Sequence, residues 1–222
     1  MGEHNSLARH GQPGLSNSFG AVLRGVDWNV YLASHNLSRS HMHQGTNYRY
    51  QSWQPIQTNI TTRGTKPPYY GNLAVAAFMH RSWLSSQLQI SSLPASSIYS
   101  TQYASHVDDT LTRLLVVDDL HTYNIIADNN YIDPVPQPSE MCTFQLPSDC
   151  RGEAYVQRLL ANGSDAISGI TWDGYSYNYD LDKGKLVRIT HVTCGESVEV
   201  DVNGMLSIHV PWSSAAIVSL DC

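Results

Sequence analysis

Apolar residues recur at helical spacing near the start of the chain. They form one stripe, which consists of Phe19, Val22, Leu23, Val26 and Val30. Such a stripe is typical of an amphipathic helix that packs against a core. Because Ser16, Asn17 and Ser18 are good N-cap residues, we predict that the helix starts just after them and fades near residues 34–36.

The following residues alternate between extended and helical patterns. Residues 39–45 are typical of a short strand, and residues 46–66 have the polar character of a long loop. After Pro67 and Pro68, the small and apolar residues 73–79 predict a second helix over 69–83. The order helix, strand, helix is that of an α/β segment.

After about residue 88 the pattern changes to short β-branched or alternating runs between turn residues. The predicted strands are residues 98–104, 111–117, 141–146, 154–160, 166–172, 185–192, 197–202, 205–210 and 215–220. Residues 182–184 and 202–204 are hairpin signals, the second with an Asn-Gly pair. We therefore predict a mainly β chain, in which residues 88–222 form an antiparallel β-sandwich.

Charge narrows the range of partners. The 222 residues carry a net charge of −6, and only 14% of them are charged. Without a cluster of Lys and Arg, binding to nucleic acid is disfavoured. No window is apolar enough to span a membrane. The first residues lack the basic and apolar regions of an export signal, so we expect none in the chain as written.

Cysteines and glycosylation sequons favour a secreted protein. Cys142, Cys150, Cys194 and Cys222 lack CxxC spacing, which favours disulfides over a zinc site. Three pairings are possible, and a bond between Cys142 and Cys150 would close a local loop. Sequons also occur, at Asn36, Asn59 and Asn162.

Residues 41–53 combine aromatic and hydrogen-bonding side chains in a way that suits sugar binding. Tyr48, Tyr50 and Trp53 offer flat faces for pyranose rings, and polar groups such as Asn47 and His43 can line the pocket. The alternative is a polar loop whose aromatic rings pack inward.

Metal sites are disfavoured. His41 and His43 share one face of the predicted strand but lack a third ligand. The aspartate pairs at 108–109 and 118–119 could be calcium ligands or a catalytic pair. Because adjacent residues on a strand point to opposite faces, we predict that they are solvated turn ends instead. The oxygen-rich residues 178–182 lack EF-hand spacing. We predict no metal and no cofactor.

Glu3 is a candidate catalytic carboxylate. It lies within Gly2-Glu3-His4-Asn5-Ser6, whose polar groups could hold it ionised for use as a nucleophile or base. The alternative is a terminal glutamate without a role.

Several motifs in order resemble the fungal branch of glycoside hydrolase family 79. They include the Gly-Glu-x-Asn-Ser motif around Glu3, residues 14–21, residues 41–56 and the Pro-Tyr-Tyr-Gly-Asn run at 68–72. Residues 144–147, 156–159 and 162–177 look like the C-terminal β domain of that family.

The resemblance implies a (β/α)8 barrel with a β-sandwich beside it. A complete barrel needs about 250 residues, so residues 1–87 would hold its last two strand-helix units and residues 88–222 the sandwich. Members are retaining β-glucuronidases and relatives of heparanase, and Glu3 matches their nucleophile. Their acid/base glutamate, in an Asn-Glu pair, has no counterpart in this chain. Where the fungal pattern more often has an aromatic residue, this chain has residues 7–9, Leu-Ala-Arg.

Two functions follow from these patterns. The first is the C-terminal part of a retaining hydrolase that acts on β-linked uronic acids, inactive alone because retention needs two carboxyls. The second is a non-catalytic carbohydrate-binding sandwich, which would present Tyr175, Tyr177 and Tyr179 as an exposed stripe. We expect an extracellular monomer with a glycan partner. Poor folding of an orphan barrel strand is the remaining alternative.

Overall fold

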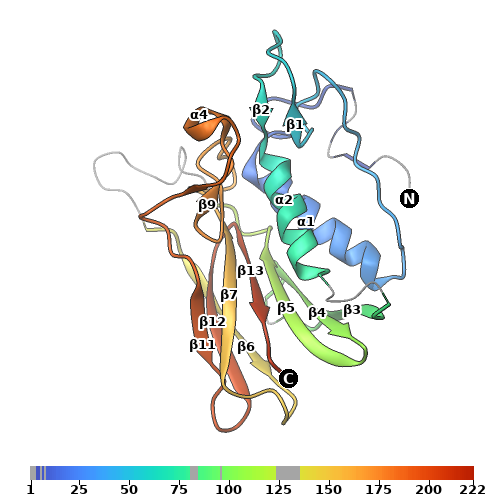
Figure 1. The fold of residues 1–222 in the computed structure, drawn as a ribbon, viewed down its shortest axis with the longest axis vertical. Helices are drawn as coiled ribbons and strands as arrows, with labels where there is room; N and C mark the ends of the chain where they lie inside the picture. Colours follow the sequence, from blue (N-terminus) through green and yellow to red (C-terminus); the bar gives the residue numbers. More distant parts are fainter. Residues whose placement is uncertain (1–3, 6, 8, 81–84, 96, 124–135) are drawn as a thin grey trace.

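The chain folds into three layers around one large antiparallel sheet (Figure 1). The computed structural model describes residues 4–5, 7, 9–80, 85–95, 97–123 and 136–222. Helices α1 (Phe19–Ser34) and α2 (Pro67–Phe78) cover one face of the sheet. A two-stranded sheet of β6 (Ser139–Gln145) and β12 (Met205–Pro211) covers the other face.

The helices begin where the capping residues predict. Oγ of Ser18 accepts the N–H of Ala21, which satisfies one of the free donors at the start of α1. The prediction for this helix is confirmed. Helix α2 starts at Pro67, whose fixed φ suits the first turn. It ends at Phe78, so the prediction that it continues toward residue 83 is wrong at Met79 and His80, where the last turn tightens.

Among the residues that the structure describes, the large sheet has nine strands. Its order is β10-β9-β8-β7-β13-β5-β4-β3, and β11 also pairs with β7. Their bounds are β3 Leu88–Leu93, β4 Ser100–Val107, β5 Thr110–Asp118, β7 Glu153–Leu160, β8 Thr171–Trp172, β9 Tyr175–Ser176, β10 Val187–Arg188, β11 Glu196–Glu199 and β13 Ser214–Ser219. A separate pair joins β1 (Trp53–Gln54) to β2 (Gly64–Thr65), and the short helix α4 covers Tyr179–Asp182.

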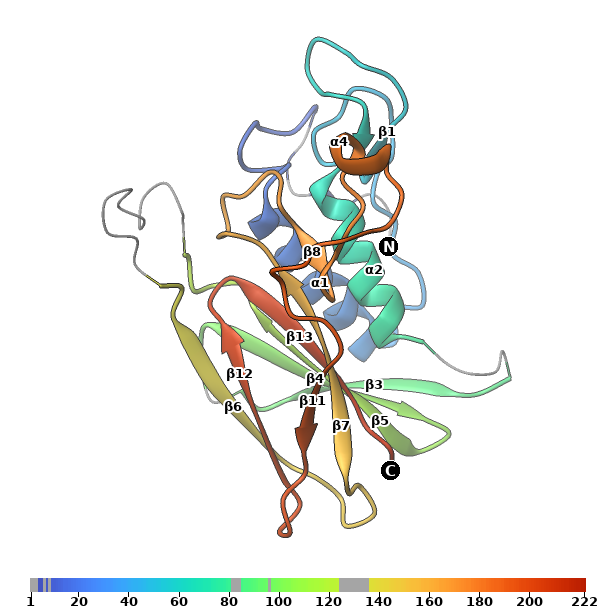
Figure 2. The same ribbon diagram turned by 60° about the vertical axis from the view of Figure 1, so that its left-hand side comes forward.

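The central strands are buried on both faces. On β5, Leu115 and Val117 face the helices, whereas Leu114 and Val116 face β6 and β12. Alternate residues of β13 divide between the same two cores. Such strands appear in sequence as continuous apolar runs because neither face meets solvent. Figure 2 shows β6 and β12 lying beside the large sheet on the side away from α1 and α2.

Most predicted strands are confirmed, and the predicted strands that are much shorter than expected are 166–172, 185–192 and 197–202, of which only 197–199 is strand in the last case. Only the last two residues of the predicted strand 166–172 and only Val187 and Arg188 of 185–192 are strand. Sequence patterns missed β3, whose Ser-rich stretch is only weakly apolar, and the two-residue strands β1, β2 and β9.

Both predicted hairpin signals are turns, but only one of them lies between neighbouring strands. Residues 202–204 do turn, with Oδ1 of Asp201 accepting the N–H groups of Asn203 and Met205. This turn carries the chain from β11 in the large sheet to β12 in the small one. At 182–184, Lys183 has φ 52° and ends helix α4. The hairpin prediction at 202–204 is therefore wrong in its connection, whereas 182–184 lies in the connection between β9 and β10, which pair antiparallel.

The predicted strand over residues 39–45 is not present; only His41 forms an isolated bridge. A strand needs a neighbouring ladder. At His43 a side chain takes that role, since the His43 N–H donates to Oδ1 of Asn5 at 2.6 Å and Nδ2 of Asn5 donates to the His43 carbonyl.

Candidate functional site

An aromatic cluster forms the centre of the candidate sugar-binding loop. The rings of Tyr48 and Tyr50 stack with centroids 5.3 Å apart, and the rings of His43 and Tyr48 meet edge-to-face with centroids 4.7 Å apart. Tyr50 is only 4% exposed, and its hydroxyl donates a 2.7 Å hydrogen bond to the Arg9 carbonyl. The ring of Tyr50 therefore packs inward, while Tyr48 and His43 remain half-buried around it.

Asn47 and Trp53 have different positions in the same loop. Asn47 has φ 75°, a left-handed conformation that asparagine tolerates better than most residues. Its Oδ1 accepts the hydroxyl of Thr58 at 2.6 Å, so one side-chain atom stabilises the loop. Trp53, on β1, is 54% exposed. Of the predicted sugar-contacting rings, it offers the most open face.

Sequence reasoning missed two buried glutamines in this loop. Gln51 and Gln54 are both 0% exposed, and Nε2 of Gln51 donates to Oε1 of Gln54. Oε1 of Gln51 and Nε2 of Gln54 have no hydrogen-bond partner among the described residues. Unpaired buried amides are costly, so these two atoms indicate where a further polar group would be stabilising. Their placement within a loop gave no periodic signal in the sequence.

Glu3 lies outside the described residues. Its neighbour His4 is buried, and burial is the main cause that lowers the pKa of its imidazole. Nε2 of His4 contacts Oγ of Ser40. Asn5 bonds to His43, as described above. His4 and Asn5 are therefore fixed beside residues 40–43, at the start of the candidate sugar-binding loop, residues 41–53, which we call the aromatic loop.

The other glutamates lie in the β-rich part of the chain. Glu140 is on β6, Glu153 on β7, and Glu196 and Glu199 on β11. The carboxylate of Glu196 accepts two hydrogen bonds of 2.6 Å from Arg158, which hold its pKa below the usual range. This pair joins two strands of the large sheet.

The prediction of a solvated turn at residues 118–119 is wrong for Asp118, which is 1% exposed. Its carboxylate accepts the Ser213 N–H and lies 2.8 Å from Nδ1 of His121. Burial raises the pKa of Asp118. His121 is stacked against Trp212, with centroids 4.2 Å apart. Asp108 and Asp109, with φ 50° and 65°, do form the exposed β4–β5 turn.

Asp118, His121 and Glu140 bring possible ligand atoms within 4.8 Å of one another, the one such group found among the described residues. The 2.8 Å hydrogen bond between Oδ2 of Asp118 and Nδ1 of His121 already pairs these two side chains with each other. The group thus holds the start of the 118–123 segment against Ser213.

The tyrosines near α4 are half-buried rather than exposed as a stripe. Tyr177 packs edge-on against Tyr69, with ring centroids 5.4 Å apart. The guanidinium of Arg188 lies 5.6 Å from the Tyr175 ring. In the oxygen-rich stretch 178–182, Oδ1 of Asn178 accepts the Asp180 N–H at 3.0 Å and caps α4.

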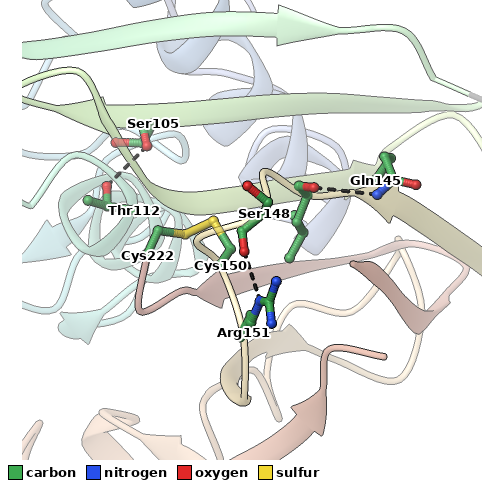
Figure 3. Close-up of a disulfide and its surroundings, with 8 residues drawn as sticks. Ser105, Thr112, Gln145, Ser148, Cys150, Arg151 and Cys222 are labelled. Atoms are coloured by element: carbon green, nitrogen blue, oxygen red, sulfur yellow. Dashed lines mark hydrogen bonds between the residues drawn. A yellow bond between two sulfur atoms is a disulfide. The ribbon is translucent and has the colours of Figure 1, made fainter. Parts of the chain in front are cut away.

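One disulfide joins Cys150 to Cys222, across 72 residues, as Figure 3 shows. Cys150 therefore bonds to the last residue and not to Cys142. Cys142 is buried and free, and Cys194 is half-buried and free. Burial raises the pKa of the Cys142 thiol to about 11, so it stays protonated and packs as an apolar group.

All three sequon asparagines, Asn36, Asn59 and Asn162, are exposed. In the described part of the chain, no helix is both long and apolar enough to cross a membrane.

Comparison with known proteins adds the family context. The model of the family described as "Glycosyl hydrolase family 79 C-terminal beta domain" matches residues 102–217. A curated β-glucuronidase of Aspergillus niger is 51% identical over 99% of this chain. A β-glucuronidase of Neurospora crassa is 44% identical over 98% of it. The chain spans 41% and 44% of the length of these two relatives.

A solved structure has the same fold. The 4-O-α-L-rhamnosyl-β-D-glucuronidase of Fusarium oxysporum 12S, crystallised as a Rha-GlcA complex, aligns with a TM-score of 0.72 at 20% identity. The alignment covers 99% of this chain and 42% of that one. It confirms the predicted fold class, a mainly β structure with an antiparallel sandwich that follows the last units of a barrel.

Proposed function

This chain belongs to glycosyl hydrolase family 79, and on that premise we propose that it is the C-terminal part of a β-glucuronidase-like retaining hydrolase. The main support is that its likeness to the Aspergillus niger β-glucuronidase extends over 99% of the chain, while the chain spans 41% of that relative. The proposed substrate is a glycan or glycoside that ends in a β-linked glucuronic acid.

Glu3 is the proposed nucleophile. Retaining hydrolysis needs a second carboxyl group about 5 to 5.5 Å from the first, which protonates the leaving oxygen. The four other glutamates lie on β6, β7 and β11, within the β-rich part. Because the family's acid/base group is a glutamate, we propose that it comes from a longer protein and that the 222 residues alone have negligible activity.

The aromatic loop is the proposed sugar-contacting wall. Trp53, with its exposed ring, would stack on a pyranose face. Tyr48 and His43 would contribute ring edges, and the amide nitrogen of Asn47 would donate to a hydroxyl. Tyr50 would act from behind, since its buried hydroxyl already bonds to the Arg9 carbonyl.

We assign residues 1–87 to the barrel segment and residues 88–222 to the sandwich domain. An extracellular location is supported by the disulfide and by the three exposed sequons. In that location the proposed partner is a glycan, bound by a monomer.

The alternative, a non-catalytic carbohydrate-binding sandwich, has less support. That function predicted an exposed stripe of Tyr175, Tyr177 and Tyr179. All three rings are half-buried, and each is in contact with another ring or a guanidinium. The three rings therefore do not form the exposed stripe that this function requires.

The decisive experiment completes the chain with the missing part of the barrel. The longer protein, encoded upstream or borrowed from the Aspergillus niger relative, should hydrolyse an aryl β-glucuronide. Glu3→Ala should abolish hydrolysis, and azide should restore release of the aryl group with a glycosyl azide of inverted configuration. Such rescue identifies a nucleophile, because azide attacks from the face that the carboxylate has left.

The matched control is Glu199→Ala, which removes an exposed carboxylate on β11 and should leave hydrolysis unchanged. Full activity of the Glu3→Ala protein, or rescue of both variants alike, would contradict the assignment. Strong activity of the 222-residue chain alone would contradict the need for a second carboxyl group from elsewhere.

A further inference from the structure

A cavity of about 240 Å³ lies where the segment before α2 meets the loops of the sandwich. Its walls come from Asn17, residues 62–67, residues 167–170 and the start of α4. Figures 1 and 2 both place α4 beside the β1–β2 end of helix α2. The cavity is thus built from residues far apart in sequence, outside the aromatic loop proposed above.

Gly64 allows these parts to meet closely. It has φ 103°, and a Cβ at this position would lie 2.3 Å from Cβ of Tyr179. Any larger residue would force α4 away from β2. On the same side, the guanidinium of Arg63 lies 4.8 Å from the centre of the Tyr179 ring. This cation–π contact holds a positive charge at the rim of the cavity.

Lys66 provides a second positive charge in the lining of the cavity. Its Nζ donates a 2.6 Å hydrogen bond to Oγ1 of Thr62. Burial lowers the pKa of Lys66, and the nearby Asp180 partly opposes this effect. No carboxylate among the described residues lies within ion-pair distance of the ammonium. A partly desolvated cation without a paired anion gains free energy when a carboxylate reaches it.

Side chains, and not the helix terminus, would bind such an anion. Pro67 and Pro68 occupy the first turn of α2 and have no N–H groups to donate. Arg63 and Lys66 outweigh the one acidic residue in the lining, Asp180, although the whole chain carries a net charge of −6. The cavity is therefore a local positive site on an acidic protein.

The remaining lining is suited to a sugar. Asn178 is a polar residue of the lining, and Tyr70 and Tyr179 are aromatic ones. We propose that this cavity binds the carboxylate and ring of a uronic acid residue in an acidic glycan, at a subsite separate from the aromatic loop. The glycan class rests on the proposed function, whereas the preference for a carboxylate rests on Arg63 and Lys66.

The chain contains only three lysines, Lys66, Lys183 and Lys185, which allows a direct test. Reductive ¹³C-dimethylation keeps their positive charge and gives each an NMR signal. A tetramer of β-1,4-linked glucuronic acid should shift the Lys66 signal, and raise the pH at which Lys66 titrates, much more than it affects the other two. Cellotetraose, the same chain without carboxylates, should leave the Lys66 signal in place.

Affinity measured by calorimetry provides the second readout on the unlabelled chain. Lys66→Met should weaken binding of the acidic tetramer at least about tenfold, as for loss of a charge-assisted hydrogen bond. Lys185→Met removes an exposed lysine just beyond α4 and should have little effect. Both substitutions remove one positive charge, so a difference between them cannot come from the change in net charge.

The proposal is overturned if the acidic tetramer does not bind, if cellotetraose binds equally well, or if both variants lose affinity alike. Equal shifts of all three lysine signals would also overturn it. Because none of these measurements requires hydrolysis, a chain that binds through Lys66 but never cleaves an aryl glucuronide would refute the proposed catalysis and keep the subsite.

Discussion

The hydroxyl of Tyr103, on β4, donates a 2.6 Å hydrogen bond to Oδ1 of Asp27, on helix α1. Thr101 donates to the same oxygen at 2.6 Å. Burial, followed by the contact with Asp27, raises the pKa of the Tyr103 hydroxyl, which therefore stays a donor. These bonds join the proposed barrel segment to the sheet through one carboxylate oxygen.

We predict that Tyr103→Phe lowers the free energy of unfolding by about 1–2 kcal/mol, the usual net value of a hydrogen bond to a charged group. Urea denaturation measures the change. Tyr99→Phe removes the hydroxyl of a 44% exposed tyrosine and should change stability by less than about 0.5 kcal/mol. Equal effects of the two substitutions would show that the Asp27 contact adds nothing.

Asp119 should make stability depend on pH. Burial, followed by the charge of Asp27, raises the pKa of this carboxyl to about 6, whereas an unfolded chain releases the proton near about 4. The stability that protonation provides is fully present below about pH 4 and is lost as the pH rises through about 6. Oδ1 of Asp119 has no partner among the described residues to offset this cost.

Asp119→Asn should therefore raise the free energy of unfolding at pH 8 by about 1–2 kcal/mol, after allowance for solvent screening. The gain should vanish near pH 4. Urea titrations at pH 4, 6 and 8 test this, with Asp149→Asn, in an exposed turn, as the control. A gain that is the same at all three pH values would contradict the proposed ionisation.

Local periodicity explains which parts of the fold were predictable. Helix α1 has a stripe of apolar residues and a capping serine, both of which lie within its own sequence. The central strands β5 and β13 are apolar on both faces, so their runs were clear without knowing their partners. Such elements can be predicted because the pattern of apolar residues within the strand or helix indicates which of its faces are buried.

The predictions that were wrong, or that the sequence could not make, concern residues whose contacts are with distant parts of the chain. Residues 39–45 have strand composition but meet the side chain of Asn5 instead of a strand. Asp118 looked like a turn residue, yet Ser213, 95 positions away, buries and binds it. Sugar-binding predictions depend on exposure, and sequence alone could not separate the inward-packed Tyr50 from the exposed Trp53. No sequence motif marked Arg63 and Lys66, because the cavity that they line is completed by residues 167–170 and 178–180, which are far away in the sequence.

The bond between Cys150 and Cys222 should contribute strongly to stability. It closes a loop with a sequence separation of 72 residues, which in the chain-entropy account is worth about 4 kcal/mol. The double variant Cys150→Ala/Cys222→Ala should lose roughly that amount, and dithiothreitol should have no further effect on it. Alkylation of the denatured, unreduced protein should label only Cys142 and Cys194. Labelling of Cys150 would contradict the pairing.

Trp53 and Tyr50 should respond differently in the completed enzyme, although the sequence alone made them equivalent. Trp53→Ala removes an exposed ring and should raise KM for an aryl β-glucuronide about tenfold, with stability almost unchanged. Tyr50→Phe removes only the hydroxyl that bonds to Arg9 and should cost about 1 kcal/mol of stability, with little change in KM. Initial rates and urea denaturation of both variants separate the two roles. The reverse pattern, with KM sensitive to the Tyr50 hydroxyl and indifferent to Trp53, would mean that the loop turns its other face to the substrate.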